Sequence, residues 1–420
     1  MSYDLPDSRK RHPEYTEDII RSLYRGKTSV TVTGSKGKGS SALILSAILG
    51  TYGRVGLMTG PHIKSFNERF RVGTELISDR ELADTVSALK PLFDKTAPDP
   101  SMGAFISPIG IETAVAESFF FAHDTDFDIY EHGKGVKYDD VKNIPASYAI
   151  INSVFLEHTR ELGHTTEAIA EDKACIIRPG MKGIYSGWQS GPVADIIIRH
   201  ADEAGVPLKL AGRDFDIDRV RFMQNGMSCS VTTKRRRYED LEISLMGSNQ
   251  CRNLAIAVAA AEDIVGDTFC VTKKEETALR EALLSLEWFG RLSILRKKPL
   301  LMVDCCINPA SARGALETVS ELGIERAVFI LAIPDDKDHL GVAKTVCDNG
   351  HDIILTKVAN PHYRFKGIQQ KRLTEAGIPC RYAEDLGTAI RSVGEEGRPA
   401  VILGTTAMLS ELTGYLGDLF

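Results

Sequence analysis

A glycine-rich loop between a buried strand and a helix is the feature that most constrains this chain. The segment from Ser29 to Ser41 reads SVTVTGSKGKGSS. Its β-branched part, Val30–Thr33, predicts a buried strand, and the apolar residues of Ala42–Leu49 predict a helix after the loop. In this order the glycines let backbone N–H groups face an anion, and the helix N-terminus adds partial positive charge. The segment therefore predicts a site for the phosphates of a nucleoside triphosphate.

Two side chains of this loop have expected roles of their own. Lys38 is expected to lie between the β- and γ-phosphates, and the Ser40 hydroxyl is expected to reach Mg²⁺. The alternative is a glycine turn whose lysines face solvent, which the strand-to-helix context of Gly-Lys-Gly-Ser makes less favourable. The rest of the phosphate cradle is expected to come from Gly34, Ser35, Lys36, Gly37, Gly39 and Ser41.

The length of 420 residues exceeds what one hydrophobic core usually organises, so two or three domains are expected. Residues 1–290 alternate predicted strands and helices, which indicates an α/β P-loop ATPase domain with a mainly parallel sheet. The pattern restarts after a change of composition near 288–291, and residues 291–420 predict a smaller Rossmann-like α/β domain.

Several elements are expected within this plan. Strands are expected at Val55–Met58, Asp128–Glu131 and Tyr148–Asn152, and helices at Thr166–Ile177 and Asn249–Val265. Three alternating segments between 215 and 245 indicate an antiparallel meander.

Charge and composition limit the partners. The net charge is −6 and no long basic run occurs, which argues against nucleic acid as the main partner. The basic block Lys234–Arg237 lies between two alternating segments and predicts a solvated hairpin tip rather than a binding patch. No apolar run is long enough to serve as a signal segment or membrane span. The eight cysteines include no CxxC pair and indicate reduced thiols in a cytoplasmic protein.

The loop is shorter than a Walker A motif and resembles the Gly-Thr-Asn-Gly-Lys-Gly-Ser loop of folylpolyglutamate and dihydrofolate synthases, which are members of the Mur ligase superfamily. Ser35 and Lys36 replace the Thr and Asn of that pattern. The segment Met58–Ile63, followed by Asn67-Glu68-Arg69, resembles Thr-Ser-Pro-His-Leu and Asn-Glu-Arg of the same family. Gly60 stands where the family has Ser.

The resemblance also implies magnesium ligands. Ile129–Gly135 resembles an apolar strand followed by Glu-x-Gly-x-Gly-Gly, which implies that Glu131 binds Mg²⁺. Oxygen ligands at a strand end suit this hard cation. The run from Glu157-His158 to Lys173-Ala174 resembles Asp-His…Leu-Gly-x-Thr…Ile-Ala…Lys-Ala. It implies that His158 binds a second Mg²⁺ and that Lys173 is carbamylated to do the same.

Two further segments resemble the nucleotide contacts of the family. Gly247–Asn253 resembles Gly-x-His-Gln-x-x-Asn and implies that Gln250 and Asn253 contact the nucleotide, with Asn253 near adenine. Trp288–Arg291 resembles Trp-Pro-Gly-Arg at the domain junction and implies that Arg291 contacts the triphosphate, where guanidinium forms bidentate bonds.

The strand end Val303–Pro309 resembles Asp-Gly-Ala-His-Asn-Pro, which implies that Asp304 accepts bonds from the ribose hydroxyls. Ile307 stands where the family has His. The run after Gly135 keeps only Asp139 of the family's Arg-x-Asp-Ala-Thr-Asn.

The reaction that the resemblance implies is ATP-dependent formation of an amide through an acyl phosphate, with an amino acid such as glutamate added to a folate-type carboxylate. The expected catalytic residues are Lys38, His158, Lys173 and Arg291, with ATP and two Mg²⁺ ions. A Mur-like ligase of specialised metabolism or of poly-γ-glutamate synthesis is an open alternative. A nucleotide-dependent switch without ligase activity is another. The expected partners are small-molecule substrates, in a monomer or homodimer.

Overall fold

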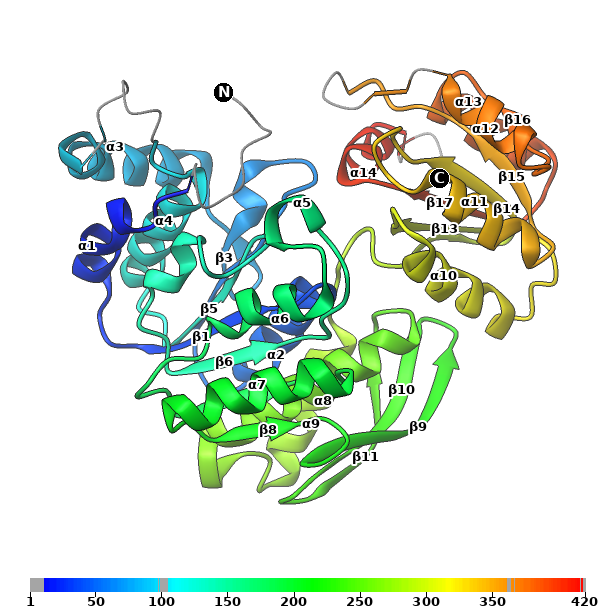
Figure 1. The fold of residues 1–420 in the computed structure, drawn as a ribbon. Coiled ribbons are helices and arrows are strands. Elements are labelled where there is room, and N and C mark those ends of the chain that lie inside the picture. The colour runs from blue at the N-terminus through cyan, green and yellow to red at the C-terminus, as the bar shows by residue number, and fades with distance from the viewer. Residues whose placement is uncertain are drawn as a thin grey trace. The chain divides into compact units, whose positions relative to one another are not determined.

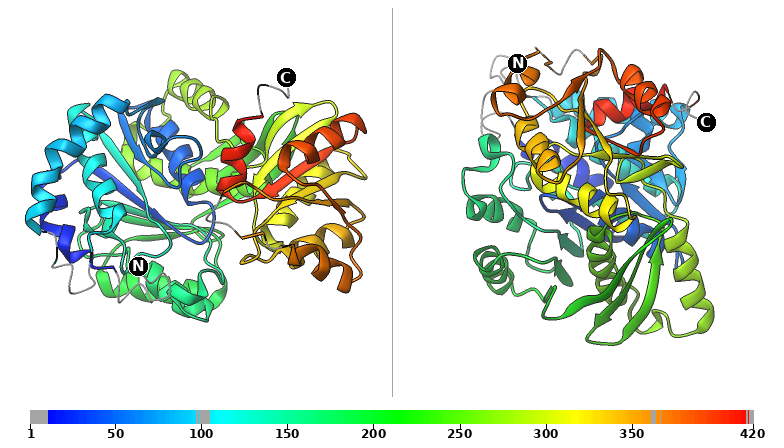
Figure 2. Two further views of the ribbon diagram at one scale, coloured as in Figure 1. Left: turned by 90° about the horizontal axis from the view of Figure 1, so that it is seen from above. Right: turned by 90° about the vertical axis from the view of Figure 1, so that its right-hand side faces the viewer.

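The computed structural model describes residues 11–96, 98, 105–360, 364–365, 367–415 and 417. Contacts divide the chain into two compact units (Figures 1 and 2). The first comprises the described residues of Met1–Asp218, Ser230–Leu241 and Arg252–Leu286. The second comprises those of Arg219–Cys229, Glu242–Cys251 and Glu287–Phe420.

An eight-stranded sheet forms the centre of the first unit. Five neighbouring pairs are parallel and the two pairs at one edge are antiparallel, so the expected mainly parallel sheet is confirmed. The spatial order is β4 (Glu75–Leu76), β3 (Phe70–Val72), β2 (Val55–Met58), β5 (Phe127–Glu131), β1 (Thr28–Thr33), β6 (Tyr148–Ile151), β7 (Gly183–Ser186) and β8 (Leu208–Leu210).

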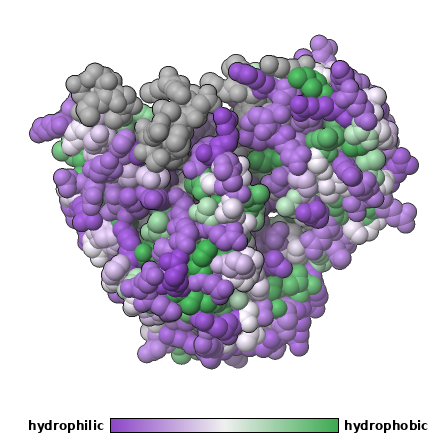
Figure 3. All heavy atoms as spheres, in the orientation of Figure 1, coloured by the Kyte–Doolittle hydropathy of each residue, from purple (hydrophilic) through white to green (hydrophobic). Residues whose placement is uncertain are grey.

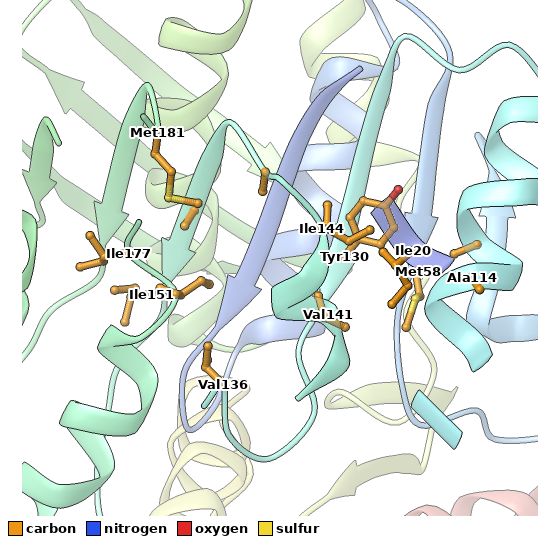
Figure 4. Packing of buried hydrophobic residues seen from close by; sticks show 14 of the residues in the cluster. Ile20, Met58, Ala114, Tyr130, Val136, Val141, Ile144, Ile151, Ile177 and Met181 are labelled. Carbon is orange, nitrogen blue, oxygen red and sulfur yellow. The ribbon is translucent and has the colours of Figure 1, made fainter. Parts of the chain in front are cut away.

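Helices cover this sheet on both faces. On one face, buried residues of several helices pack on Met58, Tyr130 and Ile151 in one core cluster (Figure 4). These helices are α1 (Glu14–Leu23), α3 (Asp79–Thr96), α4 (Pro108–Ala122), α6 (Thr166–Ala174) and α7 (Gly191–Ala204). On the other face, α2 (Lys38–Leu49) packs against β1, β2 and β5 and against α9 (Lys273–Leu284). In agreement with cover on both faces, the residues of β2 and β6 are buried throughout, and those of β1 are buried from Ser29 to Thr33.

Smaller elements lie among residues 66–286, and some of them contain residues of the second unit. The short helix α5 (Thr159–Leu162) precedes α6, and α8 (Ser248–Val265) precedes α9. Three 3₁₀ turns lie at η2 (Phe66–Arg69), η4 (Asp140–Asn143) and η5 (Gly266–Thr268). The predicted meander is a three-stranded sheet of β11 (Arg237–Ile243), β10 (Gly226–Thr233) and β9 (Phe215–Met223), in that order.

The helix predicted at Thr166–Ile177 begins where expected, because the Thr165 side chain accepts a hydrogen bond from the Ala168 amide as an N-cap. It ends at Ala174, three residues earlier than predicted. Cys175, Ile176 and Ile177 donate to carbonyls three residues back, so the chain tightens into turns while Ile176 and Ile177 stay buried. Ile176 and Ile177 therefore continue the apolar pattern because they are buried in the core, although they lie outside the helix.

The second unit is built on a six-stranded sheet, parallel except for its first pair. Its order is β12 (Ser293–Lys297), β13 (Leu300–Cys305), β17 (Ala400–Gly404), β14 (Val328–Ala332), β15 (Asp352–Leu355) and β16 (Arg381–Tyr382). The helices are α10 (Pro309–Glu321), α11 (His339–Asp348), α12 (Ile368–Glu375), α13 (Leu386–Glu395) and α14 (Thr406–Thr413). This is the Rossmann-like α/β arrangement that the sequence predicted.

The coloured residues on the face shown in Figure 3 are mostly hydrophilic. Among the described residues, no helix combines the length and the apolar character needed to cross a membrane.

Candidate active site

The phosphate loop follows β1 as predicted and leads directly into α2, whose first residue is Lys38. Gly34 and Gly37 have φ angles of 136° and 90°, which side-chain-bearing residues rarely adopt. The first helical bond runs from the Ser41 amide to the Gly37 carbonyl, at 2.8 Å. The helix N-terminus therefore points its amides at the loop, as an anion site requires.

Ser35 fixes the loop to the segment that follows β6. Its amide donates to the Ser153 carbonyl at 2.9 Å. Its hydroxyl donates to the Phe155 carbonyl and accepts from the Phe155 amide, both at 3.1 Å. Ser35 is buried and its bonds attach the loop to the segment after β6, whereas Lys36 is exposed to solvent.

Two lysines meet at one carbonyl of the loop. Lys38 Nζ and Lys173 Nζ each donate to the Gly34 oxygen at 3.0 Å. Lys173 Nζ also donates to the Lys134 carbonyl at 3.0 Å and forms an ion pair of 3.0 Å with Glu157 Oε1. The structure thus brings together Lys38 and Lys173, which lie on separate helices, beside a carboxylate.

Lys173 is completely buried in α6, and its pKa is lowered chiefly by this burial and next by the nearby Lys38 ammonium. Glu157 acts in the opposite direction and favours the charged amine. The same helix holds the loop after β5, because Asp172 Oδ1 accepts from the Val136 amide at 2.7 Å. Lys173 therefore joins two loops at the end of the sheet.

Glu131 ends β5, the parallel neighbour of β1, in register with Val32. Its side chain is 8% exposed, and Oε2 accepts from the Gly60 amide at 3.1 Å. Since the carboxyl ends of parallel strands share one edge of a sheet, this carboxylate and the phosphate loop lie on the same edge. The geometry agrees with the expected position of Glu131.

His158 lies between β6 and α5 with a φ of 45°. Its Nε2 is 3.8 Å from Glu157 Oε2, so Glu157 lies beside both His158 and Lys173. Burial lowers the pKa of the imidazole, with Glu157 opposing the effect. The neutral imidazole is the form that binds metals.

Asn253, near the start of α8, also reaches the loop. Its Oδ1 lies 3.3 Å from Ser41 Oγ and accepts a hydrogen bond of 3.1 Å from Asn152 Nδ2. Asn152 was not predicted as a site residue, although it was placed at the end of a strand. A polar residue directly after a buried strand, on the edge that carries the phosphate loop, is the signal that would have indicated it.

The remaining predicted residues belong to the second unit. Gln250 is buried, and its backbone N–H donates to the Gly247 carbonyl at 2.9 Å. Asp304 is the penultimate residue of β13, is buried, and accepts from the Leu292 backbone amide at 3.1 Å. Arg291 Nη1 donates to the Gly290 carbonyl at 3.3 Å. Their approach to the phosphate loop stays a prediction.

The loop fits a triphosphate. A Cβ atom at Gly37 would lie 2.6 Å from Asn253 Oδ1, and one at Gly34 would lie 2.6 Å from Asn152 Cβ, so only glycine allows the backbone this close. Within the described ranges, no three His, Cys, Asp or Glu side chains gather as a ready-made metal site. A hard cation here would therefore take ligands from Ser40, Glu131 and phosphate oxygens together, which suits Mg²⁺.

Comparisons with known proteins identify the family of the chain. Residues 32–261 match the family described as the Mur ligase middle domain. The chain is 30% identical over 326 residues to the dihydrofolate synthase/folylpolyglutamate synthase of Bacillus subtilis, covering 77% of this chain and 74% of that protein. It is 26% identical over 382 residues to the folylpolyglutamate synthase of Lacticaseibacillus casei, covering 91% and 88%.

Solved structures share the fold. The folylpolyglutamate synthase of Mycobacterium tuberculosis, complexed with ADP and AMPPCP, superposes with a TM-score of 0.87 at 22% identity, covering 98% of this chain and 95% of that one. An FPGS–AMPPCP–folate complex superposes with a TM-score of 0.81 at 24% identity, covering 99% and 95%. The chain therefore belongs to the Mur ligase family, within which it resembles the folylpolyglutamate and dihydrofolate synthases.

Proposed function

We propose that this protein is an ATP-dependent, ADP-forming ligase that joins an amino acid such as glutamate to a folate-type carboxylate. The observation that carries the proposal is the phosphate loop, with Lys38 beside the buried Lys173 and with Glu131 on the same edge of the sheet. Family membership and the names of the relatives support it. One relative by fold was solved with an ATP analogue and folate.

The proposed roles follow the geometry and the resemblance. The cradle Gly34–Ser41 holds the triphosphate, and Lys38 contacts the phosphoryl group that is transferred. Arg291 adds a guanidinium to the triphosphate, Asp304 takes the ribose, and Gln250 and Asn253 contact the nucleotide. One Mg²⁺ would be held by Ser40 and Glu131, and a second by His158 and the carbamylated form of Lys173. Their chemistry there would be to neutralise developing charge on the phosphates.

The reaction requires two displacements. A carboxylate oxygen of the acceptor attacks the γ-phosphorus, and the bond to ADP breaks, which gives an acyl phosphate. The amine nitrogen then attacks the acyl carbon, the carbon–oxygen bond to phosphate breaks, and an amide forms with loss of a proton from nitrogen. Positioning and charge stabilisation supply most of the catalysis in such steps, so no nucleophilic side chain is needed.

Carbamylation of Lys173 stays a prediction. A carbamate forms from the neutral amine, which the lowered pKa of this buried lysine favours. The ion pair with Glu157 favours the ammonium instead. Loss of this ion pair would accompany carbamylation, because a carbamate and the Glu157 carboxylate repel each other.

A non-folate acceptor is the second candidate. Gly60 and Ile307 replace a serine and a histidine of the family pattern, and the run Lys137–Asn143 keeps only Asp139 of it. These departures favour a ligase that uses the same nucleotide chemistry on another carboxylate. A switch protein without ligase activity is the third candidate. The division into domains 1–290 and 291–420, a monomeric or homodimeric state and a cytoplasmic location stay predictions.

An ADP-release screen tests these candidates. The purified protein is supplied with ATP, Mg²⁺, a panel of carboxylates that includes reduced folates and dihydropteroate, and a panel of amino acids. We expect ADP release only when a folate-type carboxylate and glutamate are both present, with a product heavier by one glutamyl residue in the mass spectrum. Release with a different carboxylate would favour the second candidate. Nucleotide hydrolysis without any amide product would favour the switch.

A further inference from the structure

We propose that Asn152 is a positioning residue for nucleotide binding. Its side chain packs against the glycines of the phosphate loop and fixes the orientation of the Asn253 amide. The inference rests on the proposed function only in taking a nucleotide as the ligand of the loop. It assigns a task to a residue that lies outside the family motifs described above.

Asn152 is held rigidly at the end of β6. Its backbone amide donates to the Thr33 carbonyl at 2.8 Å, which extends the pairing with β1 to the first residue before the loop. Its carbonyl accepts a hydrogen bond of 3.0 Å from Gln189 Nε2. The residue is only 2% exposed. These bonds fix the backbone from which the Asn152 side chain extends toward the loop.

The side chain fills the space that the loop glycines leave. A Cβ atom at Gly34 would lie 2.6 Å from Asn152 Cβ, and one at Gly37 would lie 2.9 Å from Asn152 Nδ2. These glycines stand at the two ends of the loop turn. Because Asn152 lies close to both glycines, a displacement of its side chain would change the packing beneath both ends of the loop turn.

The Asn152 amide then links two helices. Nδ2 donates to Ser41 Oγ at 2.8 Å in α2 and to Asn253 Oδ1 at 3.1 Å in α8. An amide nitrogen carries two hydrogens, so these bonds use its full donor capacity. Loss of the Asn152 side chain would remove its hydrogen bonds to both helices.

The second of these bonds determines how Asn253 is oriented. Because Oδ1 of Asn253 faces Asn152 and Ser41, its Nδ2 group faces the other way. An amide nitrogen is a donor, and the ring nitrogens and phosphate oxygens of a nucleotide are acceptors. Asn152 thereby selects the face of Asn253 that a nucleotide would meet.

One further observation separates this role from simple packing. Asn152 Oδ1 is buried and has no hydrogen-bond partner among the described residues. Buried side-chain oxygens in native proteins generally have one, so an amide here carries a cost that a small apolar residue would avoid. The donor group explains why an amide occupies this place.

Calorimetric titration of the full chain with ADP and Mg²⁺ tests the inference without any acceptor or turnover. Removing a buried donor that leaves a partner unpaired typically weakens the interaction by a factor of about ten or more. We expect Asn152→Ala to raise the Kd for ADP by about that factor. The double variant Asn152→Ala/Asn253→Ala should bind no more weakly than the weaker single variant, since both changes break one unit.

The matched control is Asn143→Ala, which also loses a buried asparagine amide of the first unit. Asn143 Nδ2 donates to the Pro13 carbonyl at 2.7 Å and to Thr16 Oγ1 at 3.2 Å, and neither bond joins it to the phosphate loop, to Asn152 or to Asn253. This variant should lose thermal stability with an ADP affinity within about threefold of the wild type. Equal losses of affinity in both variants would overturn the proposal, as would additive effects of the two asparagine changes.

Asn253→Asp serves if Asn152→Ala does not fold. It keeps an oxygen for the Asn152 donor but replaces the Nδ2 donor, so it should bind ADP at least as weakly as Asn253→Ala. Binding like the wild type would refute the assigned orientation. A wild-type protein that binds ADP but forms no amide would contradict the proposed function and leave this inference standing, so the two failures are distinguishable.

Discussion

Glu117 is a buried carboxylate whose ionisation has a direct consequence for stability. It lies in α4, is 4% exposed, and accepts a hydrogen bond from the Tyr130 hydroxyl of β5. Burial raises its pKa from the ordinary 4.5 to about 7, although the Tyr130 hydrogen bond opposes the rise and the nearby Asp128 adds to it. The group therefore prefers to be protonated in the folded protein.

The sign of the effect follows from proton binding. Between about pH 4.5 and about pH 7 the unfolded chain has released the Glu117 proton while the folded protein still holds it. The free energy of unfolding therefore falls as the pH rises through this window and is level above it. At about 1.4 kcal/mol for each pKa unit, the raised pKa corresponds to a loss of about 3 kcal/mol.

Glu117→Gln removes the ionisation and keeps an oxygen for the Tyr130 donor. We expect the free energy of unfolding of this variant, measured by urea denaturation, to gain about 2.5 kcal/mol relative to the wild type between about pH 5 and about pH 8. The control is Glu275→Gln at the exposed N-terminus of α9, where the lowered pKa keeps the carboxylate ionised throughout. A parallel pH dependence of wild type and Glu117→Gln would refute the reasoning.

Three further predictions concern the site. Lys38→Ala should lower kcat about a hundredfold or more, as removal of an electrostatic donor to a transition state does. Unchanged turnover would contradict the contact between Lys38 and the transferred phosphoryl group. Lys173→Ala should fold but be nearly inactive, and short carboxylic acids should partly restore its activity. The wild type supplied with carbon-13 bicarbonate should show a carbamate signal in NMR. An unmodified lysine would give neither the recovery of activity nor the carbamate signal. Gly37→Ala should weaken ADP binding about tenfold or more, because its Cβ would meet Asn253 Oδ1. Gly180→Ala, with a similar positive φ but open space around it, controls for backbone strain alone.

The parts of the fold that sequence predicted well are those specified by neighbouring residues. The strand, loop and helix around Gly34 follow from β-branched residues, glycines and an apolar run in immediate succession. The start of α6 at Thr166 follows from its N-cap. Such signals lie within one turn of helix or one strand, so no tertiary information is needed to interpret them.

Long-range partners could not be predicted in the same way. Residues 234–236 of the block Lys234–Arg237 do form a hairpin tip, whereas Arg237 begins β11. Side chains of the block also pair with distant carboxylates, including Arg235 with Asp263 and Arg237 with Asp218. Lys173 and Glu157 likewise meet only because α6 folds onto the loop after β6. Asn152 was overlooked for the same reason, since its partners Ser41 and Asn253 lie far from it in the chain.

The central claim is that an acceptor carboxylate is phosphorylated by ATP before the amine attacks. The most direct test uses an acceptor whose carboxylate carries oxygen-18, with ATP, Mg²⁺ and glutamate, and mass spectrometry of the released phosphate. Because the carbon–oxygen bond of the acyl phosphate breaks in the second step, one labelled oxygen should appear in each phosphate together with one amide product. Amide product accompanied by unlabelled phosphate would contradict the acyl-phosphate route.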